Sequence, residues 1–129
     1  MLSQDIIREL KQTLDARYLD LREEIRQELL RSDNEHFIDL AGQVHDLEEE
    51  SVADLLVDID LAIIDMHVDE VRDIDAALMR LSIRSYGTCT DCQAEIEIPR
   101  LRAWPTAKRC QPCQSRYERE HAGNRHATL

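Results

Sequence analysis

Aromatic side chains are scarce in this chain, and glycine and proline are scarcer still. Aromatic residues make up 4% of its 129 residues, with one Trp and one Phe, so a large core built around buried rings is not expected. No Pro precedes Pro99, and Gly42 is the only Gly before Gly87. Because 33% of the residues are also charged, the composition predicts long, solvated helices rather than a sandwich or a barrel.

Lys and Arg are absent from the centre of the chain. Residues 32–71 contain 13 acidic residues and no Lys or Arg, whereas residues 1–31 carry a net charge of −1 and residues 72–129 a net charge of +3. The negative charge of the central segment is therefore larger in magnitude than the formal net charge of −11 for the whole chain. A field of one sign repels nucleic acid and attracts cationic surfaces or metal ions, so general coating of nucleic acid is disfavoured.

Long apolar runs are missing as well. No run approaches the roughly 20 residues that a membrane-spanning helix needs. The first ten residues, MLSQDIIREL, lack a basic region followed by an apolar one, so they do not form a secretory signal. We therefore expect a cytoplasmic protein without a membrane segment.

Apolar residues recur every three or four positions in two stretches, which predicts two amphipathic helices. The first stripe comprises Ile7, Leu10, Leu14, Tyr18, Leu21, Ile25 and Leu29, and the second Val52, Leu56, Ile59, Ile63, Met66, Ile74, Leu78 and Leu81. Together they predict a mainly α fold, in which residues 1–86 form a long antiparallel helical hairpin, or coiled coil, of about 45–50 Å. Its acidic tip is expected near residues 42–51, and Gly87 is expected as the left-handed C′ residue of the second arm.

Residues 87–129 have a different residue pattern and are expected to form a small four-cysteine zinc finger followed by a short C-terminal helix. Ile96 and Ile98 alternate with Glu95 and Glu97, which is typical of a short strand. Cys89-x2-Cys92 is followed after seventeen residues by Cys110-x2-Cys113. Each CxxC turn points two thiolates at one ion, and two such turns complete a tetrahedral site.

Such a site has no open position for water, so it predicts one structural Zn²⁺ rather than a catalytic one. Metal ligation, worth roughly 10–16 kcal/mol in small zinc modules, would compensate for the small core of this segment. Two disulfides or a CxxC redox pair are the alternatives, although paired cysteines in a reducing cytoplasm favour metal. The five histidines have no ligand spacing with the cysteines and are expected to be solvated.

Residues 86–114 resemble the zinc-finger signature of the DksA/TraR proteins, bacterial regulators that bind RNA polymerase. The matching residues are Tyr86, Gly87, the four cysteines, Ile96, Arg100, Leu101, Ala103, Pro105, Ala107 and Gln114. The hairpin ahead of them is similar to that of the longer, DksA-like members. This resemblance implies that the hairpin enters the secondary channel of RNA polymerase, where its acidic tip acts near the catalytic centre while the globular part grips the rim.

In DksA-like members the tip motif is Asp-x-x-Asp-x-Ala. Counting back from the first Cys without a gap, the matching residues are Asp46, Glu49 and Ser51, and Glu48 and Glu50 add further charge. The location is kept while the chemistry is altered, because the second acid is longer and the small apolar residue is a hydroxyl. Helix capping is an alternative role, since Asp46-x-x-Glu49 and the Ser51 motif ending in Asp54 each fit a capping box.

Members that respond to the alarmone ppGpp offer basic side chains at positions that here hold Met66, Asp73, Trp104 and Gln114. The resemblance therefore implies weak or no ppGpp dependence, because a polyanion binds poorly without cations.

We expect Trp104 to pack between the finger and the helices. At Gln93, where the family commonly has Gly, a positive φ would cost about 1 kcal/mol. Candidate contacts with the polymerase rim, or else an ordinary solvated surface, are Arg100, Arg102, Lys108, Arg109, Arg116 and Arg119.

The expected function is that of a monomeric transcription regulator that binds RNA polymerase and modulates initiation without sequence-specific DNA contacts. One alternative is a zinc-ribbon nucleic-acid binder that uses its Arg-rich finger, which predicts salt-dependent binding to DNA or RNA. Another is a purely structural coiled coil stapled by zinc, which predicts self-association. An enzyme is not expected, because the zinc site is saturated and the sequence has no phosphate-binding loop or nucleophile–base pair.

Overall fold

The computed structural model describes residues 2–32, 34–46, 51–56, 59 and 62–127. Within these ranges the only β pairing is an isolated antiparallel bridge between Thr88 and Glu95. The mainly α class predicted from the sequence is therefore confirmed. The helices are α1 (Gln4–Leu30), α2 (Glu35–Asp46), α3 (Val52–Leu55), α4 (Ala62–Ser82), α5 (Ile98–Ala103) and α6 (Gln111–Ala127).

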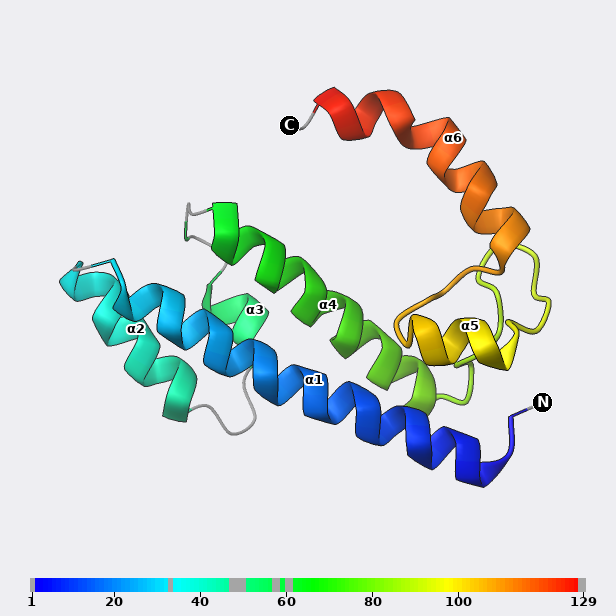
Figure 1. Ribbon diagram of the computed structural model, residues 1–129, viewed down its shortest axis with the longest axis horizontal. Coiled ribbons are helices and arrows are strands. Elements are labelled where there is room, and N and C mark those ends of the chain that lie inside the picture. The colour runs from blue at the N-terminus through cyan, green and yellow to red at the C-terminus, as the bar shows by residue number, and fades with distance from the viewer. Residues whose placement is uncertain (1, 33, 47–50, 57–58, 60–61, 128–129) are drawn as a thin grey trace.

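α1 is the central helix of the molecule. Figure 1 shows α2 folded back along the half of α1 that is distant from the finger, while α4 runs antiparallel to α1 towards α5. The Ser3 hydroxyl caps the N-terminus of α1 by accepting a hydrogen bond from the Ile6 amide at 3.2 Å. The first predicted stripe is largely confirmed, because five of its members are buried: Leu10, Leu14, Leu21, Ile25 and Leu29.

The chain first reverses earlier than expected for a two-arm hairpin of residues 1–86. α1 ends at Leu30, and α2 starts at Glu35 after a short connection. The Asn34 side chain caps α2 by accepting hydrogen bonds from the amides of His36 at 2.9 Å and Phe37 at 3.4 Å. Side-chain capping thus interrupts the helix locally, and apolar periodicity carries no information about it.

This early reversal places the C-terminal end of α2 beside the middle of α1. The Arg22 guanidinium of α1 donates to the carbonyl oxygen of Val44 at 2.9 Å. α2 itself buries Leu40, Ala41 and Val44. The end of the rod opposite the zinc finger is therefore formed by the reversal between α1 and α2 (Figure 1), and residues 42–46 of the expected tip lie in the C-terminal half of α2.

The second predicted stripe is only partly correct. Val52, Leu56, Ile59 and Ile74 are buried, but the Met66 side chain is 69% exposed, so its place on the apolar face was wrong. Besides Ile74, α4 buries residues outside the predicted stripe, namely Ile64, Val68, Val71 and Ala77. The phase differs because α3 ends at Leu55 and α4 starts anew at Ala62. The Ile63 side chain lies outside the described residues.

The left-handed C′ residue at the end of α4 is Arg84, whereas Gly87 was expected in that role. The Ser85 amide donates to the Arg80 carbonyl at 2.8 Å, and Arg84 has φ 64°, as in a Schellman motif with its left-handed residue at C′. Gly87 also has a positive φ, 85°, but it lies in the turn that leads into the finger. A Cβ atom at Gly87 would come within 2.8 Å of Leu2 Cδ1, so this glycine allows the N-terminus to pack against the finger.

The strand expected from Ile96 and Ile98 is also wrong. Ile98 begins α5, with Glu97 as the N-cap residue and Pro99 in the first turn. Proline is favoured there because its fixed φ suits a helix and its missing N–H is not needed. None of the helices in the described part of the chain combines the length and apolarity required to cross a bilayer.

Candidate functional site

The four cysteines lie together at the junction of α5 and α6. All four Sγ atoms lie within 4.8 Å of one another, and those of Cys92 and Cys110 are 3.6 Å apart. Tetrahedral zinc with Zn–S bonds of about 2.3 Å requires sulfurs about 3.8 Å apart. No disulfide joins any of the four. The cysteines are therefore positioned to bind one zinc ion, and the expectation of metal over disulfides is confirmed.

Backbone hydrogen bonds shape the first cysteine turn. The Cys89 amide donates to the Ala94 carbonyl at 2.8 Å, and the Gln93 amide donates back to the Cys89 carbonyl at 3.0 Å. This tight turn requires φ 68° at Gln93, the left-handed conformation anticipated at this position. The second turn uses the start of α6, where the Gln114 amide donates to the Cys110 carbonyl at 2.9 Å.

The thiols of this cluster do not ionise alike. Burial tends to raise the pKa of Cys89, but backbone N–H groups, with that of Cys110 first, outweigh it and lower the pKa to about 6. Hydrogen bonding to Cys110, together with burial and the other thiols, raises the pKa of Cys113 to about 12. Sulfurs this close cannot all carry a negative charge without a cation between them, which is the condition that zinc satisfies.

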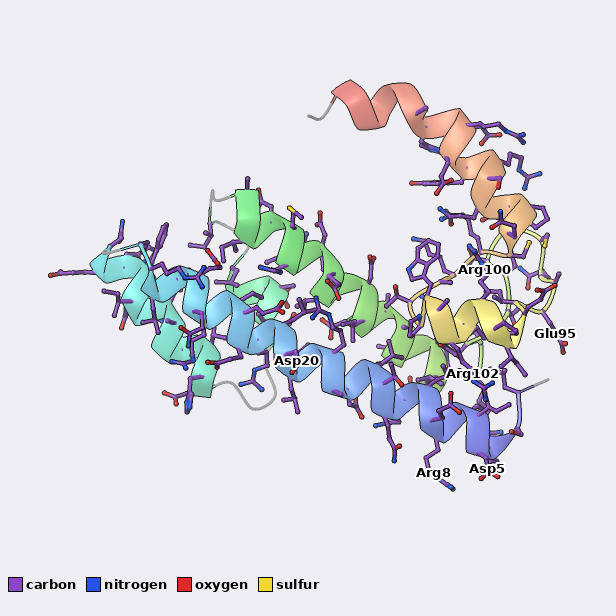
Figure 2. All side chains as sticks on the ribbon, in the orientation of Figure 1. Asp5, Arg8, Asp20, Glu95, Arg100 and Arg102 are labelled. Carbon is purple, nitrogen blue, oxygen red and sulfur yellow. The ribbon has the colours of Figure 1, made fainter. Side chains whose placement is uncertain are left out.

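Two arginines of α5 make hydrogen bonds within the chain, Arg102 to the rod and Arg100 inside the finger (Figure 2). Arg102 reaches α1, where its Nε and Nη2 atoms donate to the Glu9 carboxylate at 2.9 and 3.2 Å. Arg100 lies on the side of α5 near the start of α6, and its Nε donates to the Arg109 carbonyl at 3.1 Å. Both were predicted as contacts with a polymerase rim, and both make contacts within the chain.

The remaining basic residues of the finger divide into two groups. Arg109 donates to the Asp91 carboxylate at 2.9 Å and lies 3.8 Å above the Tyr117 ring, so it connects the first cysteine turn to α6. Arg116 Nη2 lies 3.7 Å from Cys113 Sγ. Lys108 and Arg119 are exposed. A role for any of the six at a polymerase rim stays a prediction.

The acidic residues predicted for the tip are only partly described. Asp46 ends α2, and its side chain is 84% exposed, while Glu48, Glu49 and Glu50 lie outside the described residues. Ser51 is the N-cap of α3, and its hydroxyl accepts a hydrogen bond from the Asp54 amide at 3.4 Å. The capping role considered for Ser51 is therefore confirmed.

Trp104 does not pack between the finger and the helices as expected. Its side chain is 41% exposed, and the Arg100 guanidinium lies 5.0 Å from its ring. The expectation of solvated histidines also needs correction at two positions. His67 is only 21% exposed and approaches Glu24 at 3.8 Å, and His121 stacks on Tyr117 with ring centroids 4.0 Å apart.

Two contacts of α1 escaped the sequence analysis. Arg17 pairs with Glu70 of α4 through bonds of 2.5 and 2.9 Å. Arg22 bonds backbone carbonyls of α2. The charges on α1 offered no signal for either contact, because both partners are distant in the chain and one of them is main chain.

Comparison with known proteins identifies the finger and the fold. Residues 84–119 match the family model of the prokaryotic dksA/traR C4-type zinc finger. The structure of the transcription factor DksA2 from Pseudomonas aeruginosa matches with a TM-score of 0.61 and 24% identity, over 93% of this chain and 88% of that one. The chain carries the DksA/TraR zinc finger on a DksA-like fold. The resemblance found in the sequence is thereby confirmed.

A relative in Aquifex aeolicus, an uncharacterized protein, is 38% identical over 55 residues. The match covers 43% of this chain and 38% of that relative. The chain thus matches well under two thirds of the length of this relative.

Proposed function

We propose that this protein is a transcription regulator that binds RNA polymerase. The observation that carries the proposal is the four-cysteine centre inside a DksA/TraR finger, joined to a helical rod whose fold matches a transcription factor over nearly the whole chain. A zinc saturated by four protein ligands leaves no open position for chemistry. The metal therefore stabilises the finger, and the regulatory effect comes from surfaces that the fold presents.

The acidic end of the rod is the part that we expect to enter the secondary channel of the polymerase. α2 lies along the half of α1 that is distant from the finger (Figure 1), and its acidic residues Glu35, Asp39 and Asp46 are all exposed. No Lys or Arg occurs in residues 32–71. Concentrated negative charge favours a basic, magnesium-containing environment, such as the catalytic centre of a polymerase.

ppGpp is expected to enhance this regulation weakly or not at all. Met66 and Trp104 present apolar surfaces, with side chains 69% and 41% exposed. Gln114 donates to Glu118 at 3.2 Å, so this amide already has an acidic neighbour. A polyanion would find few cationic partners at these positions.

Nucleic-acid binding by the finger is less well supported. Arg102 and Arg109 are held by carboxylates of the same chain, and Arg100 by a main-chain carbonyl. Side chains committed in this way are less available for phosphate contacts. This alternative predicts binding to DNA that weakens steeply as salt is added.

The test combines a pull-down with core RNA polymerase and multi-round transcription from a ribosomal promoter. The wild type is compared with Asp46→Asn plus Glu49→Gln and with a control of equal charge change, Asp5→Asn plus Asp20→Asn, on exposed positions of α1 (Figure 2). We expect all three to bind, and only the first variant to lose the regulatory effect. Failure of the wild type to bind polymerase would refute the proposed function.

A further inference from the structure

The C-terminal end of α2 would be stabilised by a cation, which its own segment supplies only as His45. The last carbonyl groups of a helix have no partner within it and carry partial negative charge. α2 ends in Asp46, an acid at the unfavourable end, and the only base in its last turn is His45. Since residues 32–71 contain no Lys or Arg, any permanently charged donor at this end comes from another part of the chain.

Arg22 of α1 provides that donor. Its Nη2 atom donates to the carbonyl oxygen of Val44 at 2.9 Å and to that of His45 at 3.3 Å. One guanidinium thus bonds two successive carbonyls immediately before Asp46. The side chain reaches them from the middle of α1, across the interface in which Val44 is buried.

The surroundings of Arg22 show which apolar contacts hold α2 and where these contacts end. The hollow between α1 and α2 has a volume of about 230 Å³ and is lined by Leu19, Arg22, Glu23, Arg26, Val44 and His45. Apolar packing of α2 is provided by Leu40, Ala41 and Val44, none of which lies beyond Val44. The last two residues, His45 and Asp46, are exposed, so packing alone does not fix them.

We propose that Arg22 is the positioning residue of the acidic segment, holding the end of α2 against α1 so that Asp46 is presented in a defined direction. The inference rests on the proposed function for its regulatory meaning, but the contact itself can be tested without polymerase. Arg22 does not touch polymerase in this scheme. It acts through the main chain of α2.

The structural test is amide hydrogen exchange of the zinc-loaded full chain. Arg22→Met keeps the length of the side chain and removes the donor, so exchange at residues 44–46 is expected to increase about tenfold, as for loss of one charge-assisted hydrogen bond. Exchange at Leu10 and Leu14 should not change. The matched control is Arg26→Met, because Arg26 lines the same hollow but pairs with Glu23 of its own helix.

Arg22→Lys extends the test if the methionine variant fails to fold. A lysine retains the charge but has no planar fork to bridge two carbonyls, so we expect an intermediate increase in exchange. Unchanged exchange at residues 44–46 in the folded variants, or an equal increase in Arg26→Met, would overturn the proposal.

The functional test separates positioning from binding. In transcription assays Arg22→Met should lower the maximal regulatory effect several-fold while the protein concentration that gives half of that effect stays within about twofold. A general loss of stability would instead raise the half-effect concentration, because it lowers the fraction of folded protein that can bind. If the wild type proves inactive on polymerase, the proposed function fails, whereas the exchange data still decide whether Arg22 holds α2. An undiminished effect in Arg22→Met would remove its regulatory role.

Discussion

Gln93 is the residue where the first cysteine turn carries conformational strain. Its φ of 68° lies in the left-handed region, which costs an L-residue with a side chain roughly 1 kcal/mol relative to Gly. Gln93→Gly is therefore expected to raise the free energy of unfolding of the zinc-loaded protein by about 1 kcal/mol. Denaturant titration measures this change, and equal or lower stability in the variant would show that the turn is not strained.

Gly87 and Gly42 form a contrasting pair. At Gly87 φ is positive and an added Cβ would meet Leu2 Cδ1 at 2.8 Å, whereas nothing lies within 4 Å of a Cβ at Gly42. Gly87→Ala should lower the free energy of unfolding by about 1–3 kcal/mol. Gly42→Ala, inside α2, should raise it by up to about 1 kcal/mol. Thermal denaturation of both variants measures these changes in stability. A Gly87→Ala protein as stable as the wild type would contradict the close packing of Leu2.

At the scale of the elements, the Arg17–Glu70 pair is the clearest electrostatic link between α1 and α4. A hydrogen bond from Arg17 lowers the pKa of the Glu70 carboxyl below its usual value. Stability from this pair is therefore fully present above the ordinary pKa of a glutamate and is lost as the pH falls through the lowered one. Because the side chains are 41% and 40% exposed, we expect a contribution of at most about 1 kcal/mol.

Glu70→Gln tests this link. The free energy of unfolding of the variant should lie up to about 1 kcal/mol below that of the wild type at pH 7. The difference should shrink on acidification below about pH 4. Denaturant titrations at several pH values measure it. A difference that persists at pH 2 would assign the effect to packing rather than to charge.

The sequence predicted some elements better than others, for physical reasons. Leu10, Leu14 and Leu21 were identified as buried because α1 is long and unbroken, so its period of 3.6 residues persists. The reversal before α2 was missed because it depends on the Asn34 cap, a local competition that periodicity does not detect. The phase of α4 was partly missed because the chain restarts its helix at Ala62.

The functional residues, too, were predicted from the sequence in some cases and missed in others. The cysteine spacing alone predicted the metal site, because two CxxC turns leave little geometric freedom. By contrast, Arg22 was not recognised, since its partners are carbonyl oxygens rather than side chains. Arg100 and Arg102 have partners within the chain that only the fold brings near, and their role at a polymerase rim stays a prediction.

At the scale of the whole molecule, the finger and the rod are stabilised by different means. The rod buries a continuous row of apolar residues along α1. In the finger, by contrast, few large side chains are buried, chiefly Tyr86, Ile96 and Leu101. A core of that size requires metal ligation to fold. Arg102 and Glu9 join the two parts, so the finger sets the base from which the rod projects.

Removal of zinc by a chelator is therefore expected to unfold the finger while α1 and α4 stay helical. Far-UV circular dichroism should retain most of its helical signal, and amides of residues 87–113 should lose their protection from hydrogen exchange. Rebinding of zinc at pH 7 should release at least two protons, because the thiols of an unfolded finger are mostly protonated at this pH and bind zinc as thiolates. Calorimetry in buffers of different ionisation enthalpy counts these protons. Uptake without proton release would contradict ligation by these thiols.

The most direct test of the central claim is site-specific photo-crosslinking to core RNA polymerase. A photoreactive amino acid is placed at position 46, the last residue of the acidic helix α2, and, as a control, at position 118 on α6, which extends from the finger (Figure 1). The account predicts that position 46 crosslinks to residues lining the secondary channel close to the catalytic centre, while position 118 crosslinks only outside the channel or not at all. Crosslinks from position 46 that map solely to the outer surface of the polymerase would contradict it.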